Sequence, residues 1–169
     1  MQGRASPKHR GKYQAHPVNN WKGEFSFAAK HGFSSIEFIA DFEEFHSNPI
    51  FKDGGSNLIL EQSLLTGVNV DSICADCFME LPFHSSNTMV VDLAHMFLSR
   101  LIDFGGKLTP LILVLPCVDQ SRFQNSIEIK QFVQEIRSRV QELKDANIWL
   151  SLETDLNAKD FGNLLDLLP

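Results

Sequence analysis

Apolar residues along this chain recur at two spacings in turn, one typical of amphipathic helices and one typical of buried strands. Trp21, Phe25 and Ala28 lie three and four positions apart, which places them on one face of a helix. Short apolar runs of strand length separate such stretches. We predict helices near residues 21–29, 56–65, 88–104 and 126–146 and from about 157 onward, and strands at 35–39, 70–75, 111–115 and 148–152.

The predicted strands and helices alternate at a regular interval of about 36 to 40 residues, which is typical of strand–helix–strand units. Such units form parallel sheets with right-handed crossovers. The run 111–115 lies between Pro110 and Pro116 and predicts a strand buried on both faces. Two closures fit this pattern: an open doubly wound sheet and a (β/α)₈ barrel. No G-x-G-x-x-G or P-loop motif follows a strand, so a nucleotide-binding site is not supported.

Composition narrows the class of protein. The chain has 169 residues, with 15 Lys and Arg against 21 Asp and Glu and a formal net charge of −6. That length suits one domain, and the acidic balance argues against a nucleic-acid partner, because phosphate binding needs clustered cations. No apolar run is long enough for a membrane helix, and no secretion signal is visible. Three cysteines form no disulfide framework, so we expect reduced thiols and a cytoplasmic location.

Carboxylates occur where the predicted strands end. Asp76, Asp119 and Glu153 each follow a strand closely, while Glu37 and Asp41 lie in and just after the first one. The carboxyl ends of parallel strands meet at one edge of a sheet, where α/β proteins carry out their chemistry. Clustered carboxylates raise one another's pKa unless a cation neutralises them. The pattern therefore predicts a site for a hard divalent metal or for acid–base chemistry.

Residues 1–20 form a loop-like segment that contains several basic residues, among them Arg4. A solvated loop accounts for this composition, and an anion-binding arm beside a site is the alternative.

Five short strings, taken in order, give the chain a resemblance to a known family. They are Met1-Gln2-Gly3-Arg4, Gly32-Phe33-Ser34-Ser35-Ile36-Glu37-Phe38, Ser72-Ile73-Cys74-Ala75-Asp76, Leu115-Pro116-Cys117-Val118-Asp119 and Leu152-Glu153-Thr154-Asp155. In them the chain resembles the sugar phosphate isomerase/epimerase family, whose fold is the xylose isomerase-like TIM barrel. The resemblance implies a single α/β domain over residues 1–169, a partial (β/α)₈ barrel with about strands 1 to 5, the first of them clipped.

The resemblance also implies a chemistry. Family members hold one divalent metal ion (Mn²⁺, Mg²⁺, Co²⁺ or Zn²⁺) and move a proton next to the carbonyl of a ketose sugar or sugar phosphate. Glu153 matches the metal ligand and catalytic acid/base on the fifth strand. Glu37, Asp76, Asp119 and Arg4 match positions near the substrate. Whether the sugar carries a phosphate stays open, and Arg4 with its basic neighbours is only a hint toward one.

This sequence lacks the strands that carry the family's other three metal ligands. We therefore expect a truncated isomerase or epimerase that does not retain the metal and is inactive or very weakly active alone. The expected partner is a sugar, with no nucleic acid and no membrane. A non-catalytic half-barrel remnant that acts by association, including self-association through exposed sheet edges, is the alternative. An endonuclease IV-like phosphodiesterase shares the barrel but needs more metal ligands and a basic groove.

Overall fold

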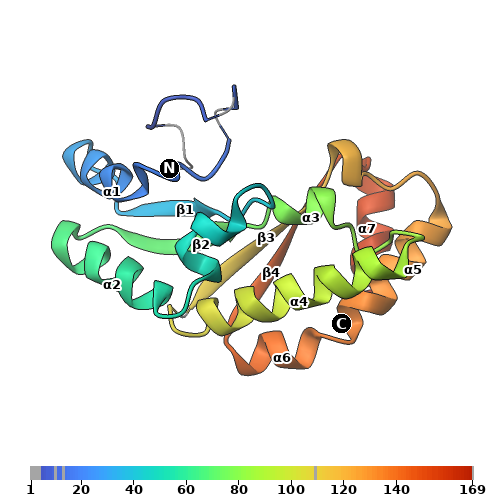
Figure 1. The fold of residues 1–169 in the computed structure, drawn as a ribbon. Helices are drawn as coiled ribbons and strands as arrows, with labels where there is room; N and C mark the ends of the chain where they lie inside the picture. The colour runs from blue at the N-terminus through green and yellow to red at the C-terminus, as the bar shows by residue number, and fades with distance from the viewer. Residues whose placement is uncertain (1–4, 10, 13, 109, 169) are drawn as a thin grey trace.

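The computed structural model describes residues 5–168 except residues 10, 13 and 109. Four strands form one parallel sheet in the order β1-β2-β3-β4 (Figure 1). Their bounds are β1 Ser35–Ile39, β2 Asn69–Cys74, β3 Leu111–Cys117 and β4 Ile148–Thr154. Within the described residues no further strand pairs with the outer edge of β1 or of β4.

Helices connect successive strands and return the chain to the same end of the sheet, as parallel pairing requires. Their bounds are α1 Trp21–Lys30, α2 Gly55–Thr66, α3 Cys77–Glu80, α4 Thr88–Gly105, α5 Ser126–Arg137, α6 Val140–Asp145 and α7 Ala158–Asp166. Three short 3₁₀ turns complete the described part: η1 Phe45–Ser47, η2 Pro49–Phe51 and η3 Asp119–Ser121. No helix in this part of the chain is long and apolar enough to span a membrane.

The register of the strands decides which side chains are covered. Phe38, Ile73 and Leu113 lie at one level of the sheet and are buried in the core together with residues of the helices. Ile112 and Trp149 pair at the preceding level and point to the opposite face, because successive side chains of a strand alternate. Ile112 is 44% exposed and Trp149 is 71% exposed. One face of the sheet is therefore packed and the other is open.

Asparagine side chains begin three of the helices. Asn87, Asn125 and Asn157 each accept hydrogen bonds from backbone N–H groups in the first turn of α4, α5 and α7. These bonds satisfy donors that have no partner within the helix. The predicted starts of these three helices are confirmed to within one residue.

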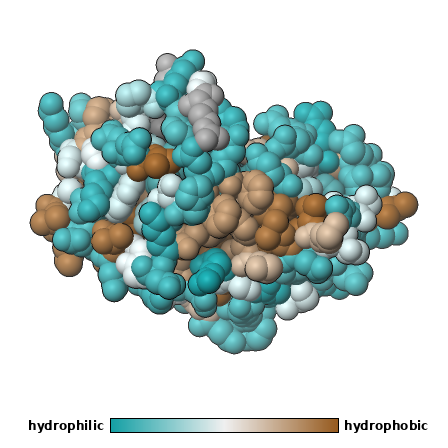
Figure 2. Space-filling view, in the orientation of Figure 1, coloured by the Kyte–Doolittle hydropathy of each residue, from teal (hydrophilic) through white to brown (hydrophobic). Residues whose placement is uncertain are grey.

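Phenylalanines form an aromatic cluster between the η turns and α4. Phe42, Phe45 and Phe51 pack around Phe97, with ring centroids 5.0 to 5.5 Å from its ring. Figure 2 shows hydrophobic residues gathered across the middle of this view, with hydrophilic residues around them.

Two details of the sequence prediction are wrong. The helix predicted over 126–146 is two helices, α5 and α6, because the Ser138 hydroxyl donates to the Glu135 carbonyl at 2.6 Å and ends the first one. The strand predicted to be buried on both faces has an open face, since Ile112 is exposed. The predicted strand positions and the α/β fold class are confirmed.

Arg139, at the break between α5 and α6, binds across to α4. Its guanidinium donates to the Ser99 hydroxyl at 2.8 Å and to the His95 carbonyl at 3.2 Å. Its Nε donates to Glu142 at 2.7 Å. The side chain therefore joins α4 and α6 in the outer layer.

Two glycines offer a matched test of the packing. A methyl group on Gly55 would lie 1.7 Å from the Pro49 carbonyl oxygen, whereas one on Gly162 in α7 would meet open space. We expect Gly55→Ala to lower the free energy of unfolding by about 3 kcal/mol or more, because the backbone must move. Gly162→Ala should raise it by about 0.5–1 kcal/mol through helix propensity. Urea denaturation of both variants measures this, and equal effects would contradict the packing at Gly55.

Candidate functional site

The carboxyl ends of the strands surround a cavity of about 420 Å³ whose walls are acidic. Three of the residues singled out from the sequence, Asp76, Asp119 and Glu153, lie on its wall. Asp41, which the sequence also places just after the first strand, lies there too, and the structure adds two exposed carboxylates, Glu43 and Glu80. The described wall also includes Lys12 and Gln14 from the N-terminal segment. The strand-end acids thus converge on one space, as their positions after parallel strands predict.

Glu153 reaches this cavity from the open face of the sheet. It pairs with Pro116 of β3, and alternation along β4 places it on the same face as Trp149 and Ser151. The side chain is exposed and belongs to a strand, so its backbone is fixed by the pairing with β3. This placement supplies an accessible carboxylate on a rigid element.

Asp76 is the most buried carboxylate of the cavity, with 4% of its surface exposed. The Cys74 thiol donates to its Oδ1 at 2.9 Å, and the Gln14 side chain donates a further hydrogen bond. Burial raises the pKa of Asp76 to about 6, and the nearby Asp41 and Glu153 carboxylates add to the increase. Burial and the Asp76 charge raise the pKa of Cys74 well above its usual value, so its thiol stays a neutral donor.

The two carboxylate oxygens of Asp41 differ in their hydrogen bonding. The backbone N–H of His16 donates to its Oδ2 at 2.9 Å. Its Oδ1 is buried and has no hydrogen-bond partner among the described residues. Burial raises the pKa of Asp41, while the bond from His16 opposes the increase.

The N-terminal segment, interpreted from the sequence as a solvated loop, packs over this edge of the sheet. The Ser6 N–H donates to Glu24 of α1 at 3.0 Å, and Lys12 Nζ lies 4.0 Å from the Glu43 carboxylate. His16 is only 1% exposed, and its ring lies 5.3 Å from that of Phe38. Neither periodicity nor composition marked Gln14 or His16, because their role comes from a contact distant in the sequence.

The other candidates differ in their positions relative to the cavity. Glu37 is half-buried on the open face, where it accepts a hydrogen bond from the Ser72 hydroxyl at 2.9 Å, and it does not line the acidic cavity. Asp119 does line the cavity and has a left-handed backbone with φ of 51°. Asp155 pairs with Arg122 at 3.4 Å instead. Arg4 lies outside the described residues.

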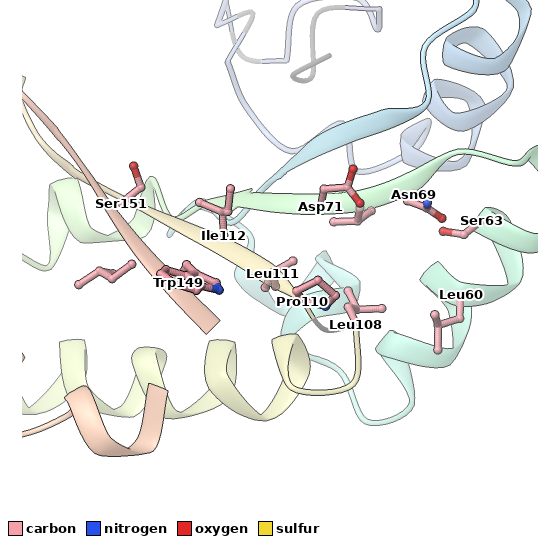
Figure 3. Close-up of a pocket in the computed structure, with 12 residues that line it drawn as sticks. Leu60, Ser63, Asn69, Asp71, Leu108, Pro110, Leu111, Ile112, Trp149 and Ser151 are labelled. Carbon is pink, nitrogen blue, oxygen red and sulfur yellow. The ribbon is translucent and has the colours of Figure 1, made fainter. Parts of the chain in front are cut away.

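A larger cavity of about 720 Å³ lies on the open face near the amino ends of the strands (Figure 3). Trp149, Ile112 and Leu111 line it, with Asp71 and Ser151 among its polar residues. In parallel α/β folds the chemistry occurs at the carboxyl ends of the strands, and the amino ends serve stability. We therefore place the candidate site at the smaller, acidic cavity.

The cavity offers only part of what a metal ion needs. Its carboxylate oxygens are the donors that Mg²⁺ and Mn²⁺ prefer. However, no group of three or more His, Cys, Asp or Glu within the described residues is arranged to hold a metal ion. The described residues therefore do not form a complete metal site.

Two solved structures share this fold. One is D-psicose 3-epimerase determined in the presence of D-fructose, with a TM-score of 0.61 and 18% identity, covering 77% of this chain and 45% of its own. The other is 3-keto-D-glucoside 4-epimerase from E. coli in its apo form, with a TM-score of 0.57 and 11% identity, covering 78% of this chain and 49% of its own.

The chain folds as part of a TIM barrel. It spans about half the length of these two barrels, and its four parallel strands with flanking helices form the corresponding part. The resemblance found in the sequence is therefore confirmed at the level of the fold, and the barrel closure is preferred over the doubly wound one. No protein-family model and no curated protein matches the sequence.

Two buried groups of the partial barrel predict opposite responses to pH. Burial lowers the pKa of His16 to about 4, so the unfolded chain binds more protons between pH 4 and 6.5 and stability is lost as pH falls. Asp76 has its pKa raised to about 6, so the folded chain binds more protons between pH 4 and 6 and stability is lost as pH rises.

Two variants separate these contributions. We compare the free energy of unfolding of Asp76→Asn with that of the unmodified chain at each pH. The variant's value minus that of the unmodified chain should increase by about 3 kcal/mol as pH rises from 4 to above 6. His16→Phe keeps the ring packing against Phe38. Its free energy of unfolding, relative to that of the unmodified chain, should increase by a similar amount as pH falls from 6.5 to 4. Urea denaturation across this range measures both differences. Differences that do not vary with pH would contradict the burial of these groups.

Proposed function

We propose that the acidic cavity is the part of a metal-dependent sugar isomerase or epimerase site that this chain contributes, with proton transfer next to a ketose carbonyl as its reaction. The observation that carries the proposal is the convergence of Asp41, Asp76, Asp119 and Glu153 at the carboxyl edge of a partial TIM barrel. The fold shared with two sugar epimerases supports the choice of substrate class.

Glu153 is assigned the proton transfer. Its carboxylate is exposed to the cavity and anchored on β4, so it can take the proton from the carbon beside the carbonyl. The carbon–hydrogen bond breaks, its electron pair forms a carbon–carbon double bond to the carbonyl carbon, the carbonyl π pair moves to oxygen, and an enediolate results. Return of a proton to the other face of that carbon completes an epimerisation, and return to the neighbouring carbon completes an isomerisation.

The other carboxylates have binding roles in this proposal. Asp41, Asp76 and Asp119 accept hydrogen bonds from sugar hydroxyl groups, and Asp76 is fixed for this by Cys74 and Gln14. Glu37 accepts a hydrogen bond from Ser72 on the open face of the sheet and does not contact the reacting carbon in this proposal.

The proposal also includes a metal ion and a second acid/base residue opposite Glu153. Glu153 would be one metal ligand, and the remaining ligands and the opposing acid would come from strands that complete the barrel. The ion would polarise the carbonyl of the sugar and stabilise the negative charge that develops there. We accordingly expect the 169-residue chain alone to be inactive or to exchange protons very slowly, in a cytoplasmic setting.

A second candidate function is association without catalysis, with a second copy of the chain as one partner. The observation that favours it is the open face, where Trp149 is 71% exposed, together with the unpaired outer edge of β4 in the described sheet.

Deuterium exchange from solvent into the carbon next to a ketose carbonyl tests the catalytic proposal, because it detects proton abstraction without net turnover. With D-fructose and Mn²⁺, we expect slow exchange that Glu153→Gln reduces by about 10²-fold or more, since the general base is lost. Asp155→Asn is the matched control, because Asp155 lies two residues on and pairs with Arg122 outside the cavity. NMR of the recovered sugar measures the exchange.

Equal exchange by Glu153→Gln and the unmodified chain would contradict the role of Glu153. Turnover as fast as that of D-psicose 3-epimerase assayed beside it would contradict the incomplete site.

A further inference from the structure

We infer that two copies of this chain associate by pairing β4 with β4 in antiparallel orientation, with Ser151 on the two-fold axis. This inference rests on the second candidate function, association without catalysis, and names its partner and its contact surface. It is drawn from the unpaired edge of β4, from the order of residues along that strand and from an apolar groove beside it.

The two outer edges of the described sheet differ in how well they accept a further strand. β1 has five residues, and its register against β2 shifts between Ile36 and Glu37. β4 has seven residues in unbroken register with β3, and it contains no proline, glycine or lysine. Natural proteins protect an edge with short strands, bulges, prolines and lysines. β4 is therefore the edge that accepts a partner strand.

The residues of β4 are complementary to themselves about Ser151. In an antiparallel pair centred there, Ser151 lies opposite its own copy, Leu150 opposite Leu152, and Trp149 opposite Glu153. The leucines make an apolar contact, the two hydroxyl groups can bond each other, and the indole N–H is a donor for the carboxylate. This is also the only symmetric register in which all seven residues of the strand are paired.

A groove of about 490 Å³ lies beside β4, lined by Leu150 and Leu152 of the strand, by α5 and α6, and by the carboxyl end of α7. α7 begins beyond the carboxyl end of β4 and has nine residues, so it extends back by about 13 Å. The seven residues of β4 extend for about 20 Å. The groove therefore continues toward the amino end of the strand, where Asn147 and Ile148 line it.

The two-fold axis brings α7 of the second copy to this groove. Antiparallel pairing places the carboxyl end of one β4 beside the amino end of the other, and α7 follows that carboxyl end. Leu165 and Leu167, at the end of α7, are 47% and 41% exposed and offer apolar surface to the groove. Lys144 is the one charged side chain among the described lining residues, and α7 carries two aspartates against one lysine. Apolar surface and charge thus match a second copy of the chain.

A pairing of β4 with β1 of a second copy is disfavoured by charge. It would continue the sheet in parallel and gather two acidic cavities at one edge. The described lining of each cavity includes six carboxylates and one lysine, so like charges would be concentrated there. In the antiparallel pair the carboxyl ends of the two sheets point in opposite directions, and the two cavities lie apart. Charge therefore favours the antiparallel arrangement.

Sedimentation equilibrium of the 169-residue chain over a range of concentrations tests this inference. We expect reversible association from 19.1 kDa to twice that mass. Ser151→Lys places two cations opposite each other and should raise the dissociation constant of the dimer at least about tenfold. Asn57→Lys adds the same charge at an exposed position of α2 and should leave the dissociation constant unchanged.

A pair of opposite charges tests the register. Ser151→Glu alone should weaken the dimer as Ser151→Lys does, because like charges again meet. An equimolar mixture of the two variants should restore association, because opposite charges then lie across the axis. Native mass spectrometry of the mixture measures the mixed dimer, and its formation also shows that both variants fold.

Ser151→Cys tests the position of the axis. Opposite residues of an antiparallel pair have Cα atoms about 4.5 to 5.5 Å apart, which a disulfide can bridge. The three native cysteines are buried, so the introduced thiol is the accessible one. Mild oxidation should give a covalent dimer of Ser151→Cys and none of the exposed control Asn57→Cys, as judged by gel electrophoresis without reductant.

The outcomes separate this inference from the proposed function. A monomer at every concentration would overturn the inference together with self-association as a function. A dimer that Ser151→Lys does not weaken, that the mixture does not restore or that Ser151→Cys does not cross-link would overturn the β4 contact and leave self-association in place. The exchange test of Glu153 judges the catalytic proposal separately from these results.

Discussion

Parallel pairing of four strands in register is the constraint on which the rest of this molecule depends. Because all four strands run the same way, their carboxyl ends meet at one edge, and the acids that follow them share one cavity. The same pairing sends alternate side chains to opposite faces. Ile73 and Leu113 therefore enter the core, while Trp149 and Glu153 lie on the open face.

The N-terminal segment packs against the carboxyl edge of the sheet and binds the acids there. Gln14 and the backbone of His16 supply donors to Asp76 and Asp41, and these bonds reduce the cost of placing carboxylates side by side in a partly buried space. Burial of the neutral His16 ring beside Phe38 holds this segment in place. The electrostatics of the site thus depend on residues that lie more than twenty positions away from the acids they bind.

Much of the fold is visible in the sequence. Apolar runs flanked by glycine and proline marked the strands, since period and length distinguish them from helices. The sequence predicted three acids of the cavity, Asp76, Asp119 and Glu153. They could be predicted because the carboxyl ends of parallel strands lie together at one edge of the sheet. The bonds from Gln14 and from the His16 backbone to acids of the cavity were not predicted, because long-range contacts leave no periodic signal. The exposure of Ile112 was missed since an apolar run does not reveal whether both faces are covered.

The seam between α5 and α6 has a consequence for which substitutions the chain can accept. One guanidinium there donates to a hydroxyl and a carbonyl of α4 and to a carboxylate of α6 at the same time. A lysine ammonium has the same charge but lacks the planar fork that reaches several acceptors in fixed directions. At position 139, therefore, lysine would preserve the charge but not this set of hydrogen bonds.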